Sequence, residues 1–179
     1  MNFKSFLFAF LFLGAFVFSA CEKDKDSDPD NEQELITTIR LSFNGGGSTV
    51  TFNATDKDGD GGLAPVIDKI TLKPNTDYTL KVEFLDESKT PSVDITEEVG
   101  EESDVHLICF TGSGSMPSPT PLDKDKNNKP LGLSSSFKTG AAGAGTLKVT
   151  LKHEPDKNNA NPCSTGETDA EATFTVEVK

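Results

Sequence analysis

The stretch TDYTLKVEFL at residues 76–85 alternates apolar and polar side chains, and this alternation decides the fold class. Tyr78, Leu80, Val82 and Phe84 recur at every second position, with the polar residues Thr79, Lys81 and Glu83 between them. Because successive side chains of a strand point to opposite faces, this stretch predicts a β-strand with one buried face. The turn residues Pro74-Asn75 precede it and mark its start.

Similar segments recur along the chain, separated by turn residues. The further expected strands are residues 35–43, 50–52, 66–72, 93–99, 105–111, 131–137, 145–153 and 170–178. No segment shows the 3.6-residue apolar stripe that a core helix requires. The pattern predicts an all-β fold, an antiparallel, immunoglobulin-like β-sandwich of eight or nine strands, with a barrel as the alternative.

Two segments lead to more specific expectations. Residues 105–111 are apolar on both faces, which is typical of a central strand. Residues 112–129 are polar and rich in proline, so we expect a long, exposed and mobile loop.

The N-terminus has the pattern of an export signal. A lysine at position 4 is followed by an uncharged apolar run at residues 6–18, and the small residues Ser19 and Ala20 precede Cys21. This arrangement predicts a secretory signal, and the run is shorter than the roughly 20 residues of a membrane span. Residues 18–21 resemble a bacterial lipobox, which implies a lipoprotein signal peptide at residues 1–20 and acylation of Cys21. An ordinary signal peptide beside a chance cysteine is the alternative.

Charge and composition divide the rest of the chain. Residues 22–32 contain no apolar residue, so we expect residues 21–34 to form an acidic, solvated tether before a sandwich domain at residues 35–179. The acidic run also resembles the surface-export signal of Bacteroidota lipoproteins, which implies an outer-membrane protein facing the cell exterior. The whole chain has a net charge of −12, which argues against nucleic acid as a partner.

Cysteine use agrees with export. If the lipid occupies Cys21, then Cys109 and Cys163 remain, and an even number in an oxidising compartment predicts one disulfide. Two separate thiols are the alternative.

The chain's two histidines, His106 and His153, are candidate metal ligands. His153 continues the alternating phase of its expected strand, which places it at the inward-facing end. Two imidazoles, with Glu102 or Glu154 as a further ligand, would bind zinc or copper if the two strand ends meet. The alternative is two solvated or hydrogen-bonded histidines without a common site.

A second metal hypothesis comes from DKDGDGG at residues 56–62. Asp56, Asp58 and Asp60 followed by Gly61 match the first half of an EF-hand calcium loop. The second half does not match, because Ile67 stands where the bidentate Glu is required. An exposed β-turn is therefore the competing interpretation.

The chain lacks the common catalytic motifs. It contains no GxSxG elbow, no HExxH and no phosphate-binding glycine loop in a strand–helix context. We therefore expect a non-catalytic binding protein rather than an enzyme.

Three stretches, residues 96–106, 130–139 and 140–156, resemble a group of small Bacteroidota outer-membrane lipoproteins. Some members carry the label "type 1 periplasmic-binding domain", but a two-lobed α/β fold does not fit a chain without helices. The resemblance implies an accessory protein of a TonB-dependent outer-membrane transporter, which captures a ligand or a partner. Metal capture, with zinc, copper or calcium as the bound ion, is the second hypothesis.

Overall fold

The structure is a computed structural model that describes residues 35–58 and 62–179. The expected signal peptide, Cys21 and the tether lie outside the described residues, and so does Asp60. Neither helix in the described part of the chain is long and apolar enough to cross a membrane.

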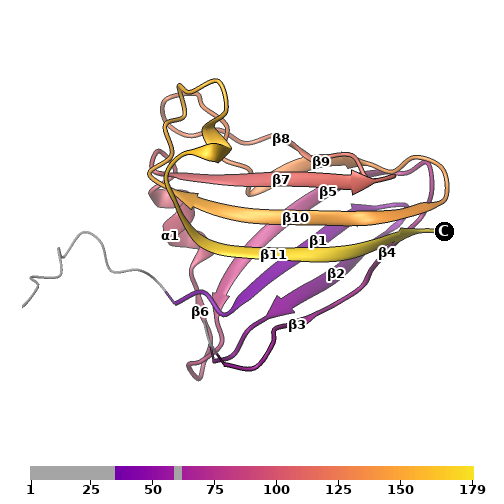
Figure 1. The fold of residues 1–179 in the computed structure, drawn as a ribbon, viewed down its shortest axis with the longest axis horizontal. Coiled ribbons are helices and arrows are strands. Elements are labelled where there is room, and N and C mark those ends of the chain that lie inside the picture. Colours follow the sequence, from indigo (N-terminus) through magenta and orange to yellow (C-terminus); the bar gives the residue numbers. More distant parts are fainter. Residues whose placement is uncertain (1–34, 59–61) are drawn as a thin grey trace, which may run out of the picture. The chain divides into compact units, whose positions relative to one another are not determined.

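The described strands form two sheets (Figure 1). In order, the larger sheet contains β3 (Val66–Ile67), β2 (Ser48–Thr55), β1 (Thr38–Gly45), β5 (Asp77–Asp86), β9 (Ser134–Lys138) and β8 (Thr120–Pro121), and β6 (Val93–Asp94) pairs with β5. The smaller sheet contains β4 (Ile70–Leu72), β11 (Glu167–Val178), β10 (Gly143–His153) and β7 (His106–Gly114). All pairs are antiparallel except β4 with β11. The prediction of an all-β sandwich is confirmed, although short strands raise the number in the described residues to eleven.

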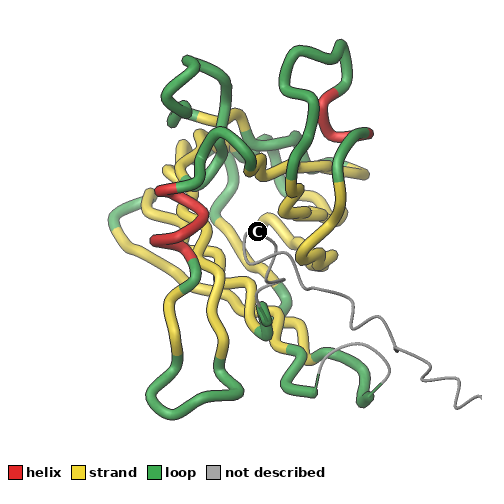
Figure 2. The backbone as a smooth tube through the Cα atoms, turned by 90° about the vertical axis from the view of Figure 1, so that its left-hand side faces the viewer, coloured by secondary structure: helices red, strands yellow, loops and turns green. Residues whose placement is uncertain are grey.

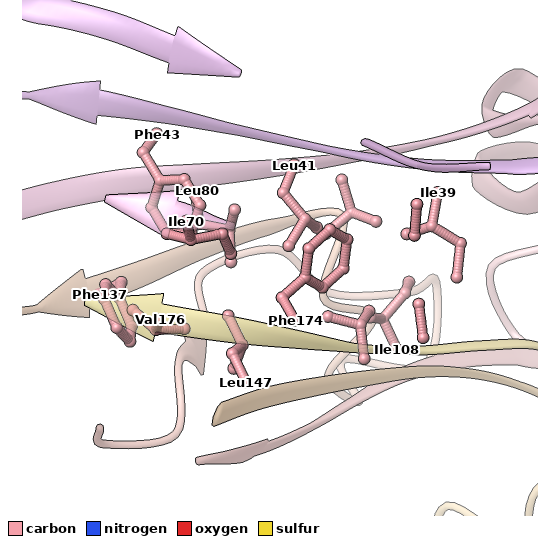
Figure 3. Packing of buried hydrophobic residues seen from close by; sticks show 14 of the residues in the cluster. Ile39, Leu41, Phe43, Ile70, Leu80, Ile108, Phe137, Leu147, Phe174 and Val176 are labelled. Carbon is pink, nitrogen blue, oxygen red and sulfur yellow. The ribbon is translucent and has the colours of Figure 1, made fainter. Parts of the chain in front are cut away.

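The core lies between the two sheets. Along β5, the side chains of Tyr78, Leu80, Val82 and Phe84 are buried as the alternation predicts. Figure 3 shows Phe174 of β11 between side chains of both sheets, and its ring is fully buried. The inward-facing phase of each strand therefore forms one continuous apolar core.

The prediction of a strand over residues 93–99 is wrong in its second half. Only β6 is extended, and helix α1 (Thr96–Glu101) follows it. Glu97 and Glu98 in the first turn suit the positive end of the helix, and Val99 is buried. Six residues are too few to display a helical apolar stripe, so the sequence pattern did not reveal this helix.

β7 is an edge strand rather than a central one. Its outward-facing Cys109 is bonded to Cys163, which lies in the connection between β10 and β11. Its free edge is also covered, since the Ile108 amide donates a hydrogen bond to the carbonyl of Leu131. Leu107 and Cys109 on the outer face of β7 are buried as well, which explains why both faces of this strand are apolar.

The expectation of a mobile, exposed loop at residues 112–129 is also wrong in part. The segment includes the end of β7, strand β8 and the buried side chains of Met116 and Asp125. Lys157 donates hydrogen bonds to the Asp125 carboxylate (2.9 Å) and to the carbonyls of Ser103 and Pro130. This buried lysine holds three loop segments together.

Candidate metal centre

His106 and His153 lie side by side at one end of the smaller sheet. His106 is the first residue of β7, His153 is the last of β10, and the two are paired across the strands. Each follows the inward phase of its strand, with Ile108 next on β7 and Leu151 on β10. The imidazole rings are stacked, with centroids 5.0 Å apart and an interplanar angle of 24°. The two strand ends therefore meet, which is the condition that the shared-site hypothesis required.

Asp169 completes a group of three donors. It lies near the start of β11, where the pairing with β10 shifts by one residue between Leu151 and Lys152. Its carboxylate oxygens lie 3.8 Å from Nε2 of His106 and 3.8 Å from Nδ1 of His153. Among the described residues, this is the group of three or more potential metal ligands found close together, with ligand atoms within 4.8 Å of one another. All three strand ends lie at the left of Figure 1, and Figure 2 looks onto that end.

The disulfide restrains the connection that joins two of these residues. Cys109 and Cys163 are bonded, with Cα atoms 5.9 Å apart, and this confirms the predicted pairing. Cys163 lies in the short 3-10 helix η1 (Pro162–Ser164), between His153 and Asp169 in the chain. The connection is thereby tied to β7, the strand that carries His106.

The remaining nitrogen of His106 is also engaged. Its Nδ1 lies 3.2 Å from the backbone carbonyl oxygen of Glu102. A carbonyl can only accept, so this contact favours the tautomer with a proton on Nδ1 and a lone pair on Nε2. Nε2 is the nitrogen that faces Asp169. A backbone carbonyl that orients the ring in this way is the usual support of a metal-binding histidine.

The electrostatics of His106 and Asp169 favour their uncharged forms. Burial lowers the pKa of His106 from its ordinary value, and the neighbouring His153 acts in the same direction. Burial also raises the pKa of Asp169, and the attraction of the two imidazoles opposes this only in part. The two 3.8 Å contacts exceed hydrogen-bonding distance, so neither is a hydrogen-bonded ion pair.

A divalent cation would fit this environment. Neutral imidazole is the form that binds a metal. A bound cation would also supply the positive partner that a buried, ionised Asp169 carboxylate needs. Tetrahedral zinc with bonds of about 2.0–2.1 Å separates neighbouring ligands by roughly 3.3 Å. The two 3.8 Å separations exceed this value by about 0.5 Å, and a separation of 4.8 Å, the upper limit within the group, exceeds it by about 1.5 Å, so zinc binding would draw the three side chains inward. Three protein ligands would leave a fourth position open.

The carboxylate of the group comes from Asp169 and not from Glu102 or Glu154, which the sequence suggested. Glu102 contributes its backbone carbonyl to the site, and its carboxylate is not in the group. Glu154 is exposed, and its amide is bonded to the carbonyl of Val105. Sequence reasoning passed over Asp169, whose one signal was a carboxylate at the entry to the last expected strand.

The calcium hypothesis is not tested by the described residues, because Asp60 lies outside them. Asp58 is described, and its carboxylate accepts a hydrogen bond from the amide of Leu63 at 2.8 Å. Asp56 directly follows β2, which belongs to the larger sheet, whereas the two histidines belong to strands of the smaller sheet.

Comparison of the chain with protein-family models, curated proteins and solved structures finds no match.

Proposed function

We propose that this protein is a non-catalytic metal-binding protein of the cell envelope, with zinc held by His106, His153 and Asp169. The observation that carries the proposal is the convergence of three donor atoms, from three strands, within 4.8 Å. Copper is the alternative ion, since it also favours imidazole ligands.

The donor set distinguishes this ion from calcium. Calcium takes six to eight oxygen ligands, whereas two of the three donors here are imidazole nitrogens. Two histidines and one carboxylate are also a donor set for Fe(II), so iron belongs in the same competition experiment.

The location in the cell envelope rests on the sequence and on the disulfide. Acylation of Cys21 would anchor the sandwich to the outer membrane by several acyl chains, which gives stable attachment. A disulfide between Cys109 and Cys163 suits an oxidising compartment. In this proposal the protein captures the ion outside the cytoplasm and passes it to a partner such as a TonB-dependent transporter.

Titration calorimetry of residues 33–179 with zinc, copper, Fe(II) and calcium tests the proposal, and this segment forms one compact unit. We expect one zinc ion per chain and no heat from calcium at the same site. Asp169→Asn is the sharpest variant, because an amide resembles the uncharged carboxyl that burial favours. It should fold at least as stably as the wild type and bind zinc at least about tenfold more weakly.

The matched control is Asp77→Asn, which removes an exposed carboxylate paired with Lys138 on the larger sheet. It should leave zinc affinity unchanged. Equal zinc affinity in Asp169→Asn and the wild type, or no zinc binding by a folded wild type, would refute the proposal.

A further inference from the structure

A cleft of about 470 Å³ opens between the sheets beside the metal centre. Ile39, Ala54 and Ile67 of the larger sheet line one wall, and Ala170 and Ala172 of β11 line the other. Its volume lies in the range of about 300–1,000 Å³ that is usual for small-molecule sites.

The rim of the cleft exposes apolar surface. Leu35 and Ile67 line the cleft, with exposed fractions of 51% and 37%. Large apolar side chains left in water around a hollow are typical of a binding site. An occupant with an apolar body would bury them.

Asp169 belongs both to the wall of this cleft and to the metal centre. The histidines follow the inward phase of their strands, as does Ala170 of the wall, which is paired with Leu151 of β10. An ion held by Asp169 would therefore lie at the margin of the cleft. Its fourth coordination position would be available to a molecule bound there.

Charge further defines the occupant. The ionisable side chains that line the cleft are Asp56, Asp169 and Glu171, all of them acidic. An organic anion therefore finds no cationic side chain in the lining of the cleft. A bound divalent cation reverses this, because it offers the anion a direct bond at the Asp169 end.

We propose that the cleft binds the apolar part of a small amphipathic chelator whose anionic donor group completes the coordination of the metal. The inference rests on the proposed metal centre and names what that centre holds: a metal–chelator complex rather than a bare ion. The donor group lies at Asp169 and the apolar chain lies between the sheets, against Ala54 and Ala172.

The test compares octanohydroxamate with acetohydroxamate, which carries the same zinc-binding group without the chain. Calorimetry with residues 33–179 is carried out with and without one equivalent of zinc. We expect octanohydroxamate to bind the zinc-loaded protein at least about tenfold more tightly than acetohydroxamate, since burial of the chain adds affinity. Without zinc, octanohydroxamate should bind at least about tenfold more weakly than it does with zinc, because the hydroxamate group then has no metal to coordinate.

Two variants assign the gain to the cleft. Ala54→Leu fills it and Ile67→Ser removes an apolar wall, and each should abolish most of the advantage of the longer chain without changing zinc affinity. Their controls are Ala141→Leu in an exposed turn and Val93→Ser, which alters a side chain of similar exposure, 40%, on β6.

The outcomes separate the two proposals. Zinc binding with equal affinity for both hydroxamates would overturn the cleft inference and leave the metal centre intact. An advantage of the longer chain that persists in Ile67→Ser and in folded Ala54→Leu, or that does not need zinc, would overturn it as well. Failure of zinc to bind the folded protein would overturn both.

Discussion

Removal of the disulfide should cost this protein a large part of its stability. Cys109 and Cys163 are 54 positions apart, so the bond closes a long loop in the unfolded chain. The chain-entropy relation, −2.1 − 1.5R ln n with n near 54, gives about 14 cal/mol/K, or about 4 kcal/mol at 25 °C. Replacement of both cysteines by alanine should lower the free energy of unfolding by about that amount, against a typical total of about 5–15 kcal/mol.

Urea denaturation followed by circular dichroism measures this loss, and it gives a second readout in the same experiment. Without the cross-link the unfolded chain is less compact, so the dependence of unfolding free energy on urea should become steeper. Wild-type protein reduced with a thiol is the control and should match the double variant. A loss below about 1 kcal/mol, with an unchanged urea dependence, would show that the cross-link does not act through the unfolded chain.

Three further predictions concern the core, the loops and the site. Phe174→Ala should lower the free energy of unfolding by about 3–5 kcal/mol, measured by urea denaturation, because a fully buried ring leaves a cavity; the exposed neighbour Thr175→Ala should change it by less than about 0.5 kcal/mol. Lys157→Met should cost about 1–3 kcal/mol in the same assay, since it removes the donor from three acceptors, and Lys138→Met, in an exposed pair, should cost far less. Because burial lowers the pKa of His106, the folded protein binds fewer protons there than the unfolded chain. The stability of the metal-free protein should therefore fall as the pH drops below about 6.5, and denaturation at pH 5 and pH 7 should show a smaller fall in His106→Gln.

The sequence predicts the sandwich because alternation is a local property that survives in every long strand. Residues 76–85 and 145–153 illustrate this, since their apolar phase is buried as expected. Residues 66–72 show the limit. They were expected to form one strand, but Val66–Ile67 pair with β2 and Ile70–Leu72 pair with β11 in the other sheet. The chain passes from one sheet to the other within the two residues between these strands. So short a break leaves no periodic signal of its own, so the sequence does not reveal it.

The sequence predicts the two histidines of the metal centre but not their contact. His106 and His153 are rare residues at the ends of well-marked strands, so sequence alone identified them as candidates. Their contact depends on the register of β7 against β10, and no sequence pattern here specifies that register. Cys109 and Cys163 were simpler to pair, because only two cysteines remained once Cys21 was assigned to the lipid.

Asp169 depends on one irregularity of the sheet. Directly opposite residues of an antiparallel pair point to the same face, so regular pairing beyond Leu151 and Ala170 would place Asp169 opposite Lys152 and on the outer face. The shift in register instead pairs Lys152 with Thr168, and the Lys152 ammonium donates a hydrogen bond to the Thr168 hydroxyl. Asp169 becomes the extra residue and shares the side of the histidines, which is the effect of a β-bulge on an adjacent side chain. The same sequence in regular register would form an outer ion pair and no three-donor site, so the bulge, rather than the residues alone, creates the candidate metal centre.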